Sequence, residues 1–89
     1  MTEPTAVGDL RAAFTVLAAR NAPLNPSDLA MLRGRVCAAV DEMRATGSLP
    51  ERVIVVVKGM ATDSGLRWSD GEMFERLVGW CVERYYEPR

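Results

Sequence analysis

Few side chains in this sequence are of the types that catalyse reactions or bind metal ions. It contains no histidine, so the commonest general base, the serine–histidine nucleophile pair and most zinc sites are missing. Two cysteines, Cys37 and Cys81, lie among apolar residues without the spacing of metal ligands, and neither has a histidine to activate its thiol. We therefore expect reduced cysteines that fill the interior, and we expect no metal and no cofactor.

Paired carboxylates are the remaining candidates for acid–base catalysis. Asp41 and Glu42 are adjacent, and adjacent side chains on a helix point about 100° apart, so they cannot meet at one reacting atom. Glu72 and Glu75 are one turn apart near a predicted helix start, where the helix dipole favours acidic side chains. We interpret all four as solvated surface residues and expect no enzyme activity.

The overall charge gives no reason to expect a nucleic-acid partner. The 12 acidic and 11 basic side chains leave a net charge of −1, which provides no long-range attraction for a polyanion or an anionic membrane. Arg33, Arg35 and Arg44 fall on one predicted helix, but the first two point apart and acidic residues share that helix. We expect no nucleic acid to bind, and a DNA-associated regulator is kept as an alternative.

Length and composition indicate a single domain spanning residues 1–89. The hydrophobic fraction of 48% and the charged fraction of 26% are those of a globular protein. No strictly apolar stretch is longer than Val53 to Val57, which is far shorter than the roughly 20 residues that span a bilayer. The first residues lack the features of a secretory signal. Arginine outnumbers lysine ten to one, which suggests GC-rich coding. We expect a bacterial, cytoplasmic protein without a membrane span.

Four stretches carry apolar residues at helical spacing. In the first, Val7, Leu10, Phe14 and Leu17 recur every three or four residues and form one stripe along a helix. Capping residues, glycines and prolines separate this stretch from the three that follow. The predicted helices cover residues 5–20, 26–46, 49–62 and 70–86.

The second predicted helix has the clearest boundaries. Asn25 can cap its first turn, Pro26 fits the first helical position, and the carboxylate of Asp28 lies near the free N–H groups of that turn. Gly47 is placed to end the helix in a left-handed conformation. The buried face is expected to consist of Leu29, Leu32, Val36, Ala39, Val40 and Met43.

The third segment is ambiguous, because Val53 to Val57 is entirely β-branched and so favours a strand. A lone strand would leave its backbone groups unpaired unless another chain supplied a partner. Ser48 and Glu51 have the spacing of a capping box, and Pro50 fits the first turn of a helix. We predict a helix and keep an intermolecularly paired strand as the alternative.

The fourth predicted helix opens with a second capping box, Ser69 with Glu72, and Trp68 is placed to pack on Met73. Short connections between the segments favour antiparallel neighbours. The predicted fold is all-α, a compact single domain of about four helices packed as a bundle or orthogonally. The apolar stripe of the fourth helix comprises Met73, Phe74, Leu77, Val78, Cys81 and Tyr85, widened by Trp80.

The third helix would be apolar on every side, and such a helix is normally surrounded by protein. Two interpretations stay open: it is the central core helix, or part of its surface faces a partner. Aromatic residues, which often anchor interfaces, gather in the last quarter of the chain. The candidate interface residues are Ile54, Val55, Trp68, Trp80 and Tyr86.

The missing catalytic groups and the aliphatic third segment favour a non-enzymatic helical module for protein–protein interaction. We expect an accessory or regulatory subunit of a bacterial complex, which docks on a protein partner or on a second copy of itself as a homodimer. A small-molecule-binding helical domain is a further alternative, with an apolar pocket between helices lined by methionines. Those methionines are Met31, Met43, Met60 and Met73.

Overall fold

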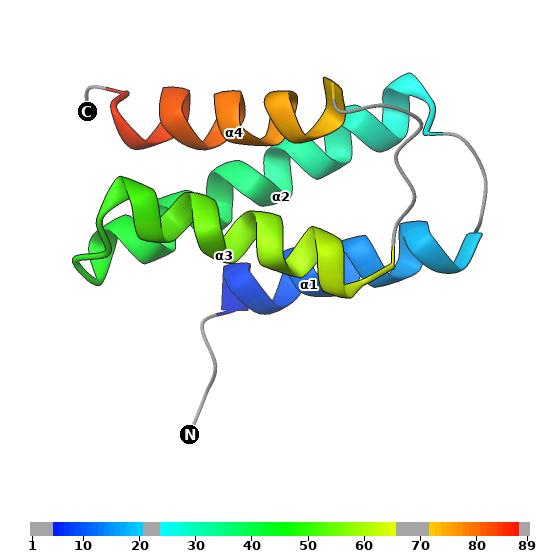
Figure 1. The fold of residues 1–89 in the computed structure, drawn as a ribbon, viewed down its shortest axis with the longest axis horizontal. Helices are drawn as coiled ribbons and strands as arrows, with labels where there is room; N and C mark the ends of the chain where they lie inside the picture. Colours follow the sequence, from blue (N-terminus) through cyan, green and yellow to red (C-terminus); the bar gives the residue numbers. More distant parts are fainter. Residues whose placement is uncertain (1–4, 21–23, 66–71, 88–89) are drawn as a thin grey trace.

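In the computed structural model, residues 5–20, 24–65 and 72–87 are described, and they form four α-helices without a strand. The predicted all-α class is therefore confirmed, and the β-branched third segment is helical. Figure 1 shows α1 and α3 running in one direction and α2 and α4 in the opposite direction, an up-and-down arrangement. The helices are α1 (Thr5–Arg20), α2 (Pro26–Ala45), α3 (Pro50–Asp63) and α4 (Glu72–Tyr85).

The longest helix, α2 with 20 residues, lies at the centre of the packing. It contacts α1, α4 and α3, whereas α1 and α4 do not touch one another within the described helices. The interpretation of the third helix as the central core helix is therefore wrong. One side of α3 stays in solvent: Glu51, Arg52 and Lys58, which flank its apolar run, are exposed, and so is Val55 within the run.

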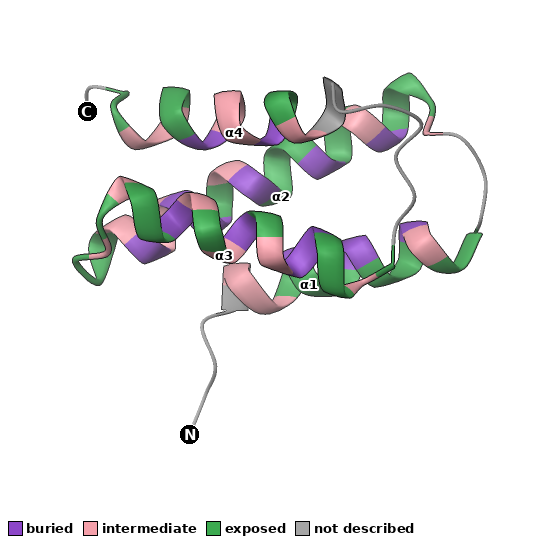
Figure 2. Cartoon of the chain, viewed as in Figure 1, coloured by how far each residue is buried: buried purple, intermediate pink, exposed green. Residues whose placement is uncertain are grey.

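All four helices contribute to one core, which Figure 2 shows along the inner faces of the helices. The predicted stripe of α1 is buried at Leu10, Phe14 and Leu17, while Val7 at its outer end is half-buried. The predicted face of α2 is buried except for Leu29, which is half-buried. The remaining core side chains are Ala13 from α1, Val53, Val57, Met60 and Ala61 from α3, and Leu77 and Cys81 from α4.

The start of α2 is capped as its sequence predicts. The side chain of Asn25 accepts a hydrogen bond of 2.8 Å from the backbone N–H of Asp28. The carboxylate of Asp28 in turn accepts one of 3.1 Å from the backbone N–H of Asn25, and Pro26 occupies the first helical position. This reciprocal capping box satisfies two backbone donors that a helix start otherwise leaves free.

The end of α2 turns on Gly47, whose φ of +88° lies in the left-handed region. The backbone N–H of Gly47 donates to the carbonyl of Arg44 at 3.0 Å, and that of Ser48 donates to the carbonyl of Met43 at 3.0 Å. These two bonds form a Schellman motif, in which glycine avoids the steric cost of a Cβ at positive φ. The predicted glycine terminator is confirmed.

The predicted capping box of Ser48 with Glu51 is wrong. The backbone of Ser48 completes the Schellman motif of α2, so the cap of α3 falls one residue later, on Leu49, which offers no side-chain hydrogen bond. Pro50 then opens α3 as expected. The carbonyl of Ser48 instead accepts a hydrogen bond of 2.7 Å from the hydroxyl of Tyr85.

The interpretation of Asp41 and Glu42 as solvated surface residues is also wrong. The Asp41 carboxylate accepts two hydrogen bonds from Arg84 of α4, at 2.9 and 2.7 Å. One oxygen of Glu42 accepts a bond of 3.0 Å from the backbone N–H of Ala6, in the first turn of α1. Their side chains diverge as predicted, but because α2 is central, each one reaches a neighbouring helix.

The expected capping box of Ser69 with Glu72 and the contact of Trp68 with Met73 lie outside the described part of the chain. None of the described helices combines the length and the apolar character needed to cross a membrane.

Candidate interaction surface

The helical period of α3 determines which of its side chains point into the core and which lie on its flanks and outer side. Val53 and Val57 point into the core and are 1% and 0% exposed. Ile54 and Lys58, one turn apart, lie on a flank of the helix, and the Lys58 ammonium lies 6.0 Å from the centre of the Phe74 ring. That contact shows that this flank of α3 faces α4.

The facing flank of α4 also carries aliphatic residues. Leu77 and Cys81 point into the core, and each is followed by a valine, Val78 and Val82, turned about 100° away from it. Phe74 lies one turn before Val78 and touches α3 through Lys58. Val78 and Val82 therefore lie on the side of α4 that borders α3.

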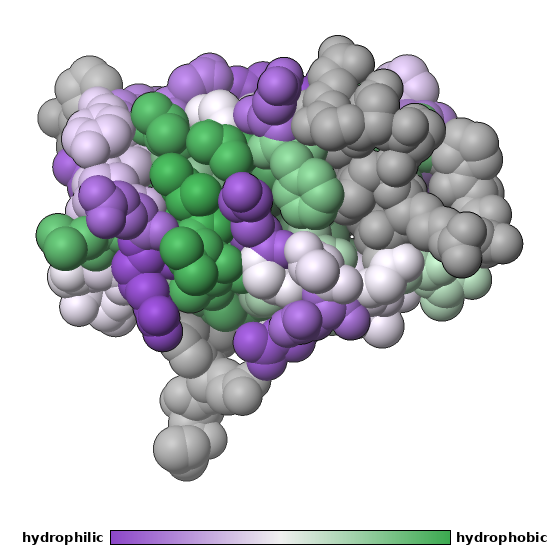
Figure 3. All heavy atoms as spheres, viewed as in Figure 1, coloured by the Kyte–Doolittle hydropathy of each residue, from purple (hydrophilic) through white to green (hydrophobic). Residues whose placement is uncertain are grey.

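Together these residues form a continuous apolar surface, which we call the apolar seam and define as Ile54, Val55, Val78 and Val82. Val55 is 61% exposed and Val82 is 38% exposed, whereas Ile54 and Val78 are half-buried. Figure 3 shows hydrophobic side chains gathered across α3 and α4 on this face. Contiguous exposed aliphatic surface is typical of a binding site, because the contact of apolar surface with water is unfavourable in free energy and a partner removes it.

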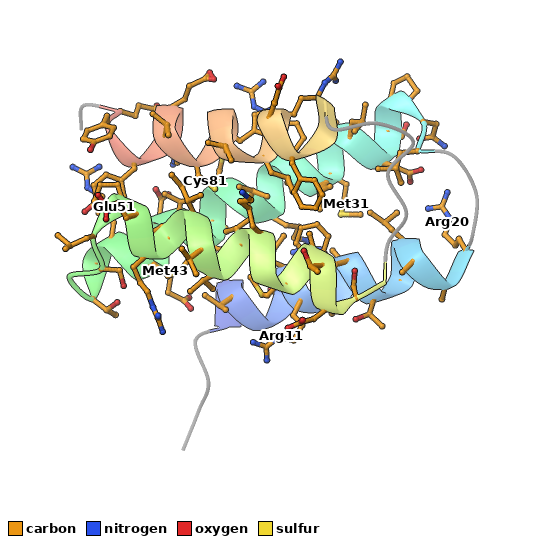
Figure 4. The ribbon with its side chains drawn as sticks, viewed as in Figure 1. Arg11, Arg20, Met31, Met43, Glu51 and Cys81 are labelled. Carbon is orange, nitrogen blue, oxygen red and sulfur yellow. The ribbon has the colours of Figure 1, made fainter. Side chains whose placement is uncertain are left out.

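Charged residues stand at the two ends of the seam on α3. Glu51 lies one turn before Val55 and Lys58 lies one turn after it, and both are exposed. Figure 4 labels Glu51 near the start of α3, at the end of the bundle where α2 connects to α3. On the side of Val55 that borders α4, the seam thus has Glu51 at one end and Lys58 at the other, whereas Arg52, which is also exposed, lies on the opposite side of Val55.

The structure brings some of the predicted interface residues together and separates others. Ile54 and Val55 belong to the seam, and Tyr86, 65% exposed, extends the α4 row one turn beyond Val82. Trp80 packs against the core on the opposite flank of α4, since it lies one turn before Arg84, which binds α2. Trp68 lies outside the described residues.

The two valines of α4 were not among the candidates from sequence. The apolar stripe predicted for the fourth helix includes Val78 as a buried residue and does not include Val82. Both positions were open to prediction in principle, because a stripe centred on Leu77 and Cys81 leaves Val82 well outside the buried arc. The sequence could not show that α3 rather than α1 would lie beside them.

Other exposed apolar residues do not form such a surface. Val16 is 56% exposed on α1, Met31 is 37% exposed on α2, and Leu49 is 69% exposed at the cap of α3. They belong to three separate elements, and single exposed apolar residues are common on soluble proteins. The seam is distinguished by its contiguity rather than by the exposure of any one residue.

A polar cluster fixes the C-terminal end of α4 beside the seam. Arg84 pairs with Asp41 through two hydrogen bonds and also contacts Glu87 at 3.1 Å, and these carboxylates raise the pKa of its guanidinium further above neutrality. The Arg44 guanidinium lies 5.7 Å from the centre of the Tyr85 ring, an interaction of a cation with an aromatic face. These contacts join α4 to α2, so the valines of α4 are held in a defined position.

Neither a cluster of metal ligands nor a readily ionised thiol in the core is found among the described residues. No group of three or more potential ligands among His, Cys, Asp and Glu is found in the parts of the chain that the structure describes. Burial and the nearby Cys37 raise the pKa of Cys81 to about 11, so its thiol stays protonated at neutral pH. Figure 4 shows Cys81 on the inner side of α4.

The methionines do not gather around a common space. Met43 and Met60 are buried in the core at 8% and 6% exposure, whereas Met31 lies at the surface of α2. The side chain of Met73 lies outside the description of the structure. Nothing in their placement favours the predicted methionine-lined pocket.

The chain has no match among protein-family models, and no curated protein or solved structure is significantly similar to it.

Proposed function

We propose that this chain is a non-enzymatic protein–protein interaction module, an accessory or regulatory subunit that docks through the apolar seam. The observation that carries the proposal is the contiguity of exposed aliphatic side chains across two helices, with Val55 at its most exposed point. A partner that covered these side chains would gain hydrophobic free energy of about 25 cal/mol for each Å² of apolar surface removed from water.

The rest of the described molecule supports a binding role over catalysis. The acid that is most buried among the described residues, Asp28 at 8% exposure, is engaged with Arg20 and Asn25 in holding two helices together. The sequence offers no histidine that could act as a general base at neutral pH. The bacterial source and the cytoplasmic location remain expectations from the sequence.

Affinity capture with two matched variants tests the proposal. Val55→Asp places a charge in the seam, whereas Val16→Asp places the same charge on α1, at a valine of similar exposure. We expect a partner that wild-type protein captures from its native cells to be lost with Val55→Asp and retained with Val16→Asp. Equal capture by wild type and both variants would show that the seam is not the docking surface.

A further inference from the structure

We propose that the partner of the apolar seam is a second copy of this chain, related to the first by a two-fold axis through the seam. This inference rests on the proposed function and names the occupant of the same surface. It is argued from the order of charges along α3 and from a glycine on its outer side.

The charges at the two ends of the seam would pair favourably between two copies of the chain. A two-fold axis through the seam near Val55 exchanges its two ends, so Glu51 of one copy meets the region of Lys58 of the other, and the reverse contact forms as well. Two attractive contacts therefore follow from one symmetry operation. A parallel arrangement of two copies would instead bring like charges together.

A glycine beside Val55 leaves room for a closely approaching helix, although the other described glycines are equally open. Gly59 lies one turn after Val55 on the outer side of α3, and a Cβ built there would meet nothing within 4 Å. The monomer therefore does not require this glycine, although glycine weakens a helix interior relative to alanine. A helix of a second copy packed across this position does benefit from the missing side chain, because the two backbones can approach more closely.

The first test is the oligomeric state of the full chain. The seam contains only four aliphatic side chains, so we expect a weak dimer with a dissociation constant of roughly 1–100 µM. Sedimentation velocity over that concentration range should show the 9.8 kDa chain converting to a species of twice that mass. A single species of monomer mass throughout the range would overturn the proposal.

Charge exchange tests the two-fold arrangement itself. Glu51→Lys and Lys58→Glu each replace two attractive contacts with repulsive ones, so each should weaken the dimer by roughly tenfold. The double variant restores opposite charges at the two ends and should return to within about threefold of the wild-type constant. The control is Glu83, an exposed acidic residue on the outer side of α4. Glu83→Lys changes the net charge as Glu51→Lys does, and it should leave the dissociation constant of the dimer within about threefold of the wild-type value. A double variant no tighter than the single variants would overturn the two-fold pairing.

Glycine substitution provides a second readout that does not depend on charge. Gly59→Ala should weaken the dimer severalfold while raising the unfolding temperature of the dilute monomer. Gly34→Ala on α2, which is also open to solvent, should raise that temperature without changing dimerisation. Equal dimerisation of Gly59→Ala and Gly34→Ala would contradict the close approach.

These results separate this inference from the proposed function. A chain that stays monomeric yet captures another protein through Val55 would disprove the second copy and leave the docking surface in place. A chain that dimerises equally well with Val55→Asp would disprove self-association through the seam, and the seam as a docking surface would fail as well only if Val55→Asp also left the capture of other proteins unchanged.

Discussion

The carboxylate of Asp28 binds both the end of α1 and the start of α2. It accepts hydrogen bonds of 2.8 and 3.0 Å from the guanidinium of Arg20, the last residue of α1, and a third from the backbone N–H of Asn25. The carboxylate therefore stabilises the N-terminus of α2 and fixes the direction in which α1 approaches it. These contacts hold the pKa of Asp28 below its ordinary value of 3.8, mainly through the hydrogen bonds from Arg20.

Replacing Asp28 with asparagine should lower stability in a pH-dependent manner. A lowered carboxyl pKa in the folded state contributes stability that is present above pH 3.8 and is lost as the pH falls toward the folded-state pKa. Urea unfolding at several pH values should show Asp28→Asn less stable than wild type at pH 7, with the difference shrinking below about pH 4. A difference that stays constant from pH 7 to acid would mean that the charge of Asp28 plays no part.

The hydroxyl of Tyr85 should contribute measurably to stability because it bonds to the carbonyl of Ser48 at 2.7 Å and ties α4 to the connection after α2. Tyr85→Phe removes this bond and should cost about 1 kcal/mol of unfolding free energy. Tyr86→Phe is the matched control: its ring is 65% exposed, so a change within about 0.5 kcal/mol is expected. Equal effects of the two substitutions in chemical denaturation would contradict this role of Tyr85.

The two cysteines should differ in reactivity. Cys81 is 2% exposed and its pKa is raised to about 11, whereas Cys37 is partly exposed. In native protein at pH 7.5, a chromogenic disulfide reagent should label Cys37 first, and Cys81 only as the bundle opens, because the thiolate is the nucleophile. Cys37→Ser should remove the early labelling phase and Cys81→Ser should retain it. The opposite result would place Cys81 at the surface.

The ends of the helices were predictable where the residues that determine them are neighbours in the sequence. The capping box of Asn25 with Asp28 and the left-handed Gly47 both follow from residues within one turn of each other, and both were predicted. The helix at Val53 to Val57 was predicted against its β-branched composition, because a strand would have had no partner. The failed capping box of Ser48 with Glu51 shows the limit of such spacing, since the backbone of Ser48 was already engaged in ending α2.

Contacts between helices could not be predicted from the local sequence patterns. Arg84 and Asp41 are 43 residues apart, and no local pattern pairs them. The same holds for the seam, whose residues come from two helices that meet only in the folded chain. The aliphatic composition of the third segment points to Ile54 and Val55, whereas no sequence pattern points to Val82, because the pattern does not show which helix lies beside α4.

Site-specific photo-crosslinking in the native cells tests the central claim, a protein interface at the apolar seam, most directly. A benzophenone amino acid at position 55 reports which protein covers the seam, and the same group at position 16, similarly exposed on α1, reports background. We predict a discrete adduct from position 55 that is absent from position 16, with its mass identifying a second copy or another protein. No adduct from position 55, or the same adducts from both positions, would contradict the account.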